Sequence, residues 1–235
     1  MDRRVVVRSG GLLLLNIFAG AYYLKQAYPS DPWAKKAQIE SPKRMSDLGR
    51  APNNVPGWPP EVGKPFPQVA LLDHEGQPFD VRAWRGKPTL IEIATMTCAG
   101  CQAFSGGDTR GAFGGMPVQQ GLASIEHYFQ EYTGQKLFSD KIHFAQILIY
   151  NLRLDPVEPG EAAMWREHFG FDRYPDVKIL TGGAPLANRA SFRMIPGFLL
   201  LDEHGTVLFD ATGHSPKHGL YTELLPAAKT LLAQR

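Results

Sequence analysis

The chain has 235 residues, with 25 Lys and Arg against 23 Asp and Glu. Hydrophobic residues make up 43% and charged residues 20%, which excludes a chain that is largely disordered or a coiled coil. The small net charge excludes a broad basic surface for nucleic acid. The two cysteines are too few for a disulfide-stapled scaffold or a four-cysteine metal site.

Residues 1–25 are expected to form a signal anchor or a signal peptide. Three arginines, the last of them Arg8, precede an apolar stretch from Gly10 to Leu24. A basic flank followed by an apolar segment is typical of export, and this one is long enough to span a bilayer. Cleavage after Ala21 and an ordinary N-terminal helix are the alternatives. We therefore expect a single-pass protein of the bacterial inner membrane with its domain facing the periplasm, or a secreted periplasmic protein if the signal is removed.

Residues 26–60 form a proline-rich linker in this interpretation. Nine of the 19 prolines lie between Gln26 and Pro67. This spacing prevents a long helix or a central strand and favours an extended tether. The alternative is an irregular arm on the domain surface, onto which Trp33 and Trp58 could dock. The folded domain is expected to span residues 61–235.

Hydrophobic periodicity and turn residues predict an α/β fold in this domain, with a central mixed sheet flanked by helices. Two buried strands joined through a helix are expected to pair in parallel, and the terminal hairpin is expected to add antiparallel edge strands. The expected strands span 68–72, 79–81, 88–95, 142–150, 177–180, 198–202 and 206–209, and the expected helices 122–132, 161–169 and 221–233.

The two cysteines, Cys98 and Cys101, come directly after the first buried strand and open a helix. The unpaired N–H groups of a helix's first turn stabilise a thiolate on the first cysteine. Two intervening residues let the second sulfur reach the first and close a disulfide. Cys98 would then attack a partner's disulfide, and Cys101 would resolve the mixed disulfide. A zinc site lacks its remaining ligands, and two inert buried cysteines are the other alternative.

Four segments resemble the thioredoxin-like superfamily: residues 62–67, residues 73–79, residues 86–90 with the cysteine pair, and residues 194–202. The most similar branch is the membrane-anchored extracytoplasmic thiol–disulfide oxidoreductases of the TlpA-like and cytochrome c maturation type, with peroxiredoxins at a distance. The resemblance covers about residues 61–235.

The resemblance implies a thioredoxin fold and a redox-active Cys98–Cys101 disulfide. It also implies a cis Pro196 and an Ile195 backbone that binds an extended segment of the partner. A trans proline that starts a strand is the alternative. No cofactor beyond the disulfide and no metal is implied. The implied partners are exported client proteins and a membrane-bound electron donor.

Glu92 lies six residues before Cys98 in an otherwise apolar strand. The resemblance implies a buried carboxylate at this spacing. Burial would raise the pKa of Glu92, which could then accept the proton of Cys101 as that thiol attacks. The alternative is that strand alternation places Glu92 on a solvent-facing or helix-covered edge.

Several features depart from a plain thioredoxin. Thr97 replaces the usual tryptophan, and Ala99-Gly100 lacks the common proline. Residues 105–121 contain six glycines, so the helix should end early. This insert is either a loop that recognises partners or an ordinary surface loop.

Two other functions stay open from the sequence. Residues 95–98 match the Thr-x-x-Cys core of peroxiredoxins, with Thr95 as the threonine, but without the proline that precedes it. A copper carrier for cytochrome oxidase assembly would use both cysteines with His214 or His218, since cuprous copper favours thiolate and imidazole. Such carriers place three residues between their cysteines, and this chain places two.

Overall fold

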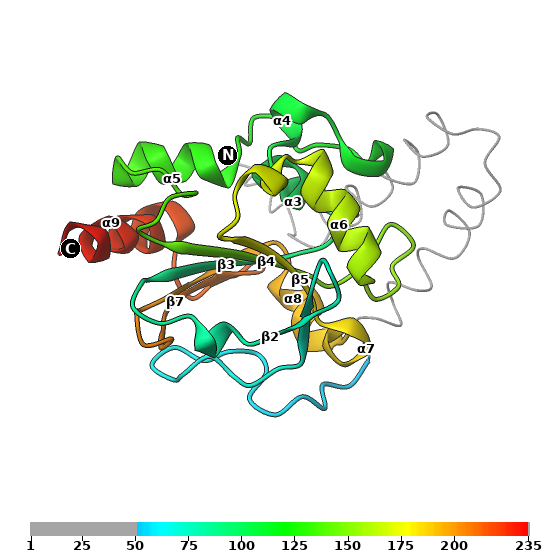
Figure 1. The fold of residues 1–235 in the computed structure, drawn as a ribbon, viewed down its shortest axis with the longest axis horizontal. Coiled ribbons are helices and arrows are strands. Elements are labelled where there is room, and N and C mark those ends of the chain that lie inside the picture. Colours follow the sequence, from blue (N-terminus) through cyan, green and yellow to red (C-terminus); the bar gives the residue numbers. More distant parts are fainter. Residues whose placement is uncertain (1–50, 235) are drawn as a thin grey trace, which may run out of the picture.

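The computed structural model describes residues 51–234, which form a seven-stranded mixed sheet with helices on both faces (Figure 1). The strand order is β2-β1-β5-β4-β3-β6-β7. The expected anchor and most of the expected linker, residues 1–50, lie outside the described residues. The strands are β1 (Leu71–Asp73), β2 (Pro78–Phe79), β3 (Thr89–Ala94), β4 (His143–Leu148), β5 (Val177–Thr181), β6 (Gly197–Leu201) and β7 (Val207–Thr212).

Strand β3 lies in the interior of the sheet and positions the cysteine pair. All six of its residues are buried, as expected for an apolar run of this length. It pairs in parallel with β4, as predicted, and antiparallel with β6. The terminal hairpin is antiparallel to β3 as expected, but only its β7 is an edge strand, because β6 lies between β3 and β7. Glu92 lies opposite Gln146 of β4 and Phe198 of β6, so these three side chains share one face of the sheet.

Helices α3 and α6 cover one face of the sheet, and α7 and α8 lie on the other (Figure 1). A sheet sandwiched in this way confirms the predicted α/β class and thioredoxin fold. The helices are α3 (Ala99–Phe104), α4 (Gly107–Arg110), α5 (Ile125–Thr133), α6 (Pro159–His168), α7 (Gly183–Leu186), α8 (Arg189–Met194) and α9 (Leu225–Ala233), the last preceded by a π-helical turn (Leu220–Leu224).

Capping residues explain where the helix predictions were inaccurate. The Ser124 hydroxyl accepts a hydrogen bond from the His127 N–H at 3.2 Å, so α5 begins after Ser124 and not at residue 122. Helix α8 was not predicted. Its cap, Asn188, accepts hydrogen bonds from the N–H groups of Ala190 and Ser191.

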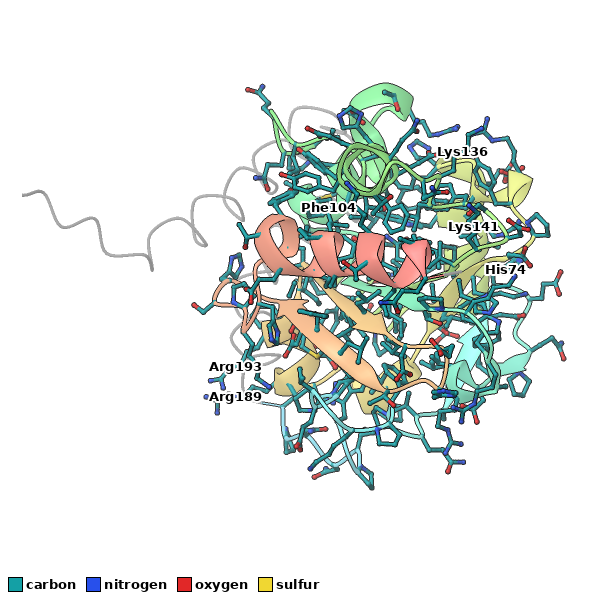
Figure 2. All side chains as sticks on the ribbon, turned by 90° about the vertical axis from the view of Figure 1, so that its left-hand side faces the viewer. His74, Phe104, Lys136, Lys141, Arg189 and Arg193 are labelled. Carbon is teal, nitrogen blue, oxygen red and sulfur yellow. The ribbon has the colours of Figure 1, made fainter. Side chains whose placement is uncertain are left out.

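Residues 51–60, at the end of the expected linker, lie against α8. Trp58 is 4% exposed, and its indole N–H donates to the Ser191 hydroxyl at 2.8 Å. The carbonyl of Ala51 accepts a hydrogen bond from the Arg189 N–H at 3.0 Å. Packing onto the domain therefore starts before residue 61. Figure 2 shows the side chains of Arg189 and Arg193 of α8 at the surface.

No helix within residues 51–234 is long and apolar enough to cross a membrane.

Candidate redox site

The cysteine pair lies where β3 gives way to α3. Cys98 is the N-cap of α3, and its sulfur accepts a hydrogen bond from the Cys101 N–H at 3.3 Å. Both residues are thiols. Cys98 is partly exposed, whereas Cys101 is fully buried. Only the first cysteine therefore reaches the surface.

The surroundings separate the two thiols chemically. A hydrogen bond from the Cys101 thiol lowers the pKa of Cys98, and the backbone N–H groups of Cys101 and Gly100 lower it further against the opposing effect of burial. Burial raises the pKa of Cys101 well above its usual value, and the neighbouring Cys98 and Glu92 raise it further. Cys98 is thus the more acidic of the two thiols, and Cys101 keeps its proton to higher pH.

The loop before β6 lies beside this pair. The Ile195–Pro196 peptide bond is cis, as the resemblance implied. Strand β6 runs next to β3, with Gly197 opposite Ile93. A methyl group added to Gly100 would lie 3.5 Å from the Pro196 ring and 3.7 Å from the Cys98 sulfur. Pro196 and the dithiol therefore face each other, while the role of Ile195 and Pro196 in binding a partner stays a prediction.

Glu92 is fully buried, which excludes the solvent-facing part of the alternative. The helix-covered part agrees with the structure, because Gln146 on the same face of the sheet contacts Trp165 of α6. Its Oε2 accepts a hydrogen bond from the Gln146 side-chain amide at 2.8 Å, and its Oε1 has no hydrogen-bond partner within the described part of the chain. Burial raises the pKa of Glu92 well above its usual value, although the bond from Gln146 opposes this effect. A carboxyl group in this state can take up a proton at moderate pH.

A buried polar network supports Glu92 and was not predicted from the sequence. Gln146 donates to Glu92 and to the Ser105 hydroxyl, both at 2.8 Å, and its Oε1 accepts from the Trp165 indole N–H at 2.6 Å. The sequence held one signal of this network. Gln146 stands inside the apolar run 142–150, as Glu92 stands inside its own strand.

The glycine-rich insert lies against α3, the helix that begins at the cysteine pair. Helix α3 ends at Phe104, as the glycines predicted. The side-chain amide of Gln102 then bonds both the N–H and the carbonyl of Phe113, at 2.8 and 3.3 Å. Further on, the Gln119 N–H donates to the Ala99 carbonyl at 3.1 Å. Residues 105–121 are therefore fastened to α3 at two points.

Two of the three residues behind the alternative functions, Thr95 and His218, are hydrogen-bonded to the backbone. The Thr95 hydroxyl donates to the Tyr150 carbonyl at 2.8 Å. His218 accepts a hydrogen bond from the Asp210 N–H at its Nδ1, and His214 is exposed. Within the described part of the chain, no three Cys, His, Asp or Glu side chains are grouped so as to hold a metal ion. Neither histidine completes a three-ligand site with the two cysteines.

No protein-family model and no curated protein matches the sequence. Among solved structures, a thioredoxin-like protein from Porphyromonas gingivalis is 14% identical, with 72% of this chain and 92% of that chain covered and a TM-score of 0.45. A conserved protein from Geobacillus kaustophilus is 16% identical, with 74% and 84% covered and a TM-score of 0.48. A secreted disulfide oxidoreductase from Mycobacterium tuberculosis is 14% identical, with 72% and 96% covered and a TM-score of 0.41.

Nothing about activity is transferred from proteins this distant. The thioredoxin-like fold is assigned from the strand order and from the placement of the cysteine pair opposite the cis-proline loop.

Proposed function

We propose that this protein is a thiol–disulfide oxidoreductase that exchanges a Cys98–Cys101 disulfide with client proteins. The observation that carries the proposal is the asymmetry of the pair: a partly exposed Cys98 with a lowered pKa stands in front of a fully buried Cys101 with a raised pKa. An exposed thiolate attacks, and a shielded thiol waits to resolve the product.

Two exchange steps move two electrons. The Cys98 thiolate attacks one sulfur of the client disulfide, forms a mixed disulfide and releases the first client thiolate. Cys101 then attacks the Cys98 sulfur, the bond from Cys98 to the client breaks, and the second client thiolate leaves. The client is reduced to a dithiol and the enzyme is oxidised to its disulfide. Glu92 accepts the proton that Cys101 loses, and the client thiolates take theirs from water. In the reverse direction the same site oxidises a client dithiol.

In the proposed mechanism, the client lies across the cis-proline loop as an extended segment beside Ile195 and Pro196. The basic and apolar segment at residues 1–25 supports a location at the periplasmic face of the bacterial inner membrane. The clients there would be exported proteins, and a membrane-bound electron donor would regenerate the dithiol.

A redox titration of the full chain against glutathione buffers, scored by thiol alkylation, tests the proposal. We expect a reversible two-electron transition that is absent from Cys98→Ser and Cys101→Ser. A midpoint near the thioredoxin range of about −270 mV would identify a reductant, and one near about −120 mV an oxidant.

The Cys101→Ser variant should also accumulate a mixed disulfide with a model client, because the resolving thiol is missing. If no reversible disulfide forms in the unmodified chain, the oxidoreductase proposal fails.

A further inference from the structure

The orientation of the Gln146 side chain is fixed by its three partners. An indole N–H only donates, so the atom of Gln146 that faces Trp165 at 2.6 Å is the amide oxygen. The NH2 group must then face the other way, toward Glu92 and Ser105. Trp165 thus decides which group of Gln146 meets the carboxyl of Glu92.

This orientation makes the two oxygens of Glu92 unequal. Oε2 accepts an N–H from Gln146, and a hydroxyl oxygen is a weaker acceptor than a carbonyl or carboxylate oxygen, so a proton on Oε2 would weaken this bond. Oε1 is buried and has no hydrogen-bond partner among residues 51–234, so a proton there leaves the bond from Gln146 intact. A carboxylate held in this way has one oxygen for its hydrogen bond and the other for its proton.

The titratable groups that interact with Glu92 are the two cysteines at the start of α3. Cys98 raises the proton affinity of Glu92, and Glu92 in turn raises that of Cys101. The neighbouring strands present Gln146 and Phe198 in register, and α6 contributes Trp165, none of which titrates. Among the described residues, the dithiol is thus the electrostatic neighbour with which Glu92 is coupled.

We propose that Gln146, oriented by Trp165, is a positioning residue that keeps Oε2 of Glu92 as a hydrogen-bond acceptor and reserves Oε1 for the proton of Cys101. The inference rests on the proposed function for the source of the proton, but the arrangement itself does not require exchange activity. Gln146 and Trp165 do not touch the reacting sulfurs in this scheme. They set the pH above which Glu92 is deprotonated and can accept the proton of Cys101.

The experiment follows the protonation of Glu92 in the reduced full chain by the infrared carbonyl band of its protonated acid, with Glu92→Gln identifying the band. Gln146→Leu removes the N–H that stabilises the carboxylate, so the midpoint should move to higher pH. Trp165→Phe should move it in the same direction, because Gln146 can then turn its oxygen toward a protonated Glu92. We expect proton affinity to rise by about tenfold in each variant.

Trp58→Phe is the matched control. It also removes a buried indole N–H with a side-chain acceptor, at 2.8 Å from Ser191, but on α8 at the other face of the sheet. It should lower stability as Trp165→Phe does and leave the Glu92 midpoint unchanged. The pH profile of the second exchange step should follow the infrared midpoint in every variant.

A midpoint that stays in place in both Gln146→Leu and Trp165→Phe overturns the inference. Equal shifts in Trp165→Phe and Trp58→Phe overturn it as well, since they would reflect general loosening. If Gln146→Leu does not fold, Trp165→Phe decides alone, because it deletes an N–H and keeps an aromatic ring. If the glutathione titration fails while the midpoints shift, the oxidoreductase proposal falls and the positioning role stands.

Discussion

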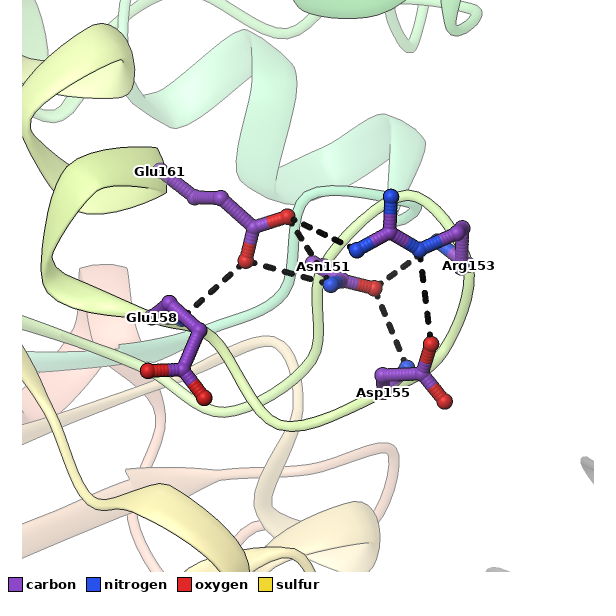
Figure 3. A network of polar contacts seen from close by, with 5 residues as sticks. All are labelled: Asn151, Arg153, Asp155, Glu158 and Glu161. Atoms are coloured by element: carbon purple, nitrogen blue, oxygen red, sulfur yellow. Dashed lines mark hydrogen bonds and ion pairs between the residues drawn. The ribbon is translucent and has the colours of Figure 1, made fainter.

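Two glutamates in this protein, Glu92 and Glu161, differ in their surroundings and therefore in the role that each carboxylate can have. Glu92 lies in the middle of β3, fully buried, with a single donor at Oε2 and none at Oε1. Glu161 lies in the first turn of α6, where the Asn151 amide donates to both of its oxygens at 2.9 and 3.1 Å (Figure 3). The Glu158 N–H adds a bond at 3.0 Å, and Arg153 lies 3.5 Å away.

The difference lies in how many donors and how much solvent each carboxylate has. The carboxylate of Glu161 is hydrogen-bonded by fixed donors and is accessible to water, since its side chain is 21% exposed. It also links the loop after β4 to the start of α6. Glu92 has neither solvent nor a full set of donors, so its charged form is disfavoured and its proton affinity is high. The same side chain is a structural tie at Glu161 and the proposed proton acceptor at Glu92.

The largest expected effect that tests this contrast is on the exchange rate. Glu92→Gln should slow thiol–disulfide exchange with a model disulfide by about 100-fold, because general-base help to Cys101 is lost. Glu161→Gln should leave the rate unchanged. The measurement is the rate of reduction of a fluorescent peptide disulfide at neutral pH. Equal rates for the two variants would remove the proton-accepting role from Glu92.

The second prediction concerns stability against pH. The pKa of Glu92 is raised in the folded state above its usual value of 4.5, so the folded protein binds more protons than the unfolded chain at pH values between the two. Stability from this group is present below about pH 4.5 and falls as pH rises through the folded pKa. Urea unfolding of the reduced protein and of Glu92→Gln across this range should show a difference that grows with pH and then levels off. A constant difference would mean that Glu92 is charged in the folded protein.

Much of the site could be predicted from sequence because its signals are local. The spacing of Cys98 and Cys101 and their place after an apolar strand predicted the cysteine pair, whereas the cis Pro196 was implied by the resemblance. Burial of Glu92 could not be decided by alternation alone, because β3 is buried on both faces and its pattern is continuous. The resemblance, and not the hydrophobic periodicity, predicted that Glu92 is buried.

The supporting residues could not be found in this way. Gln146 and Trp165 are 54 and 73 residues from Glu92, and only the parallel register of β3 and β4 and the packing of α6 bring them to it. The ordered insert was missed for a similar reason. Its glycines predicted a loop, but no local pattern reveals the hydrogen bonds by which the Gln102 side chain fastens that loop to α3. Long-range hydrogen bonds leave little trace in a single sequence.

The third prediction concerns Glu161, the glutamate with the structural role. Glu161→Ala leaves the Asn151 amide and the Glu158 N–H without their acceptor and removes a negative charge from the start of α6. We expect the free energy of unfolding to fall by about 1–2 kcal/mol. Urea unfolding with an unchanged m-value measures it, and the exchange rate of the folded protein should stay the same. A drop in rate without a loss of stability would show that this network reaches the dithiol.

The smallest effect is expected at Arg153. Its side chain is 60% exposed and lies 3.4 Å from Asp155 and 3.5 Å from Glu161, distances at which an ion pair in solvent contributes little. Arg153→Met should therefore change the free energy of unfolding by about 0.5 kcal/mol or less, and added salt should have little further effect. A loss as large as that of Glu161→Ala would mean that charge, and not the amide of Asn151, holds the loop. Glu161 and Glu92 would then differ in whether the carboxylate has an ion-pair partner, and no longer in hydrogen bonding and burial.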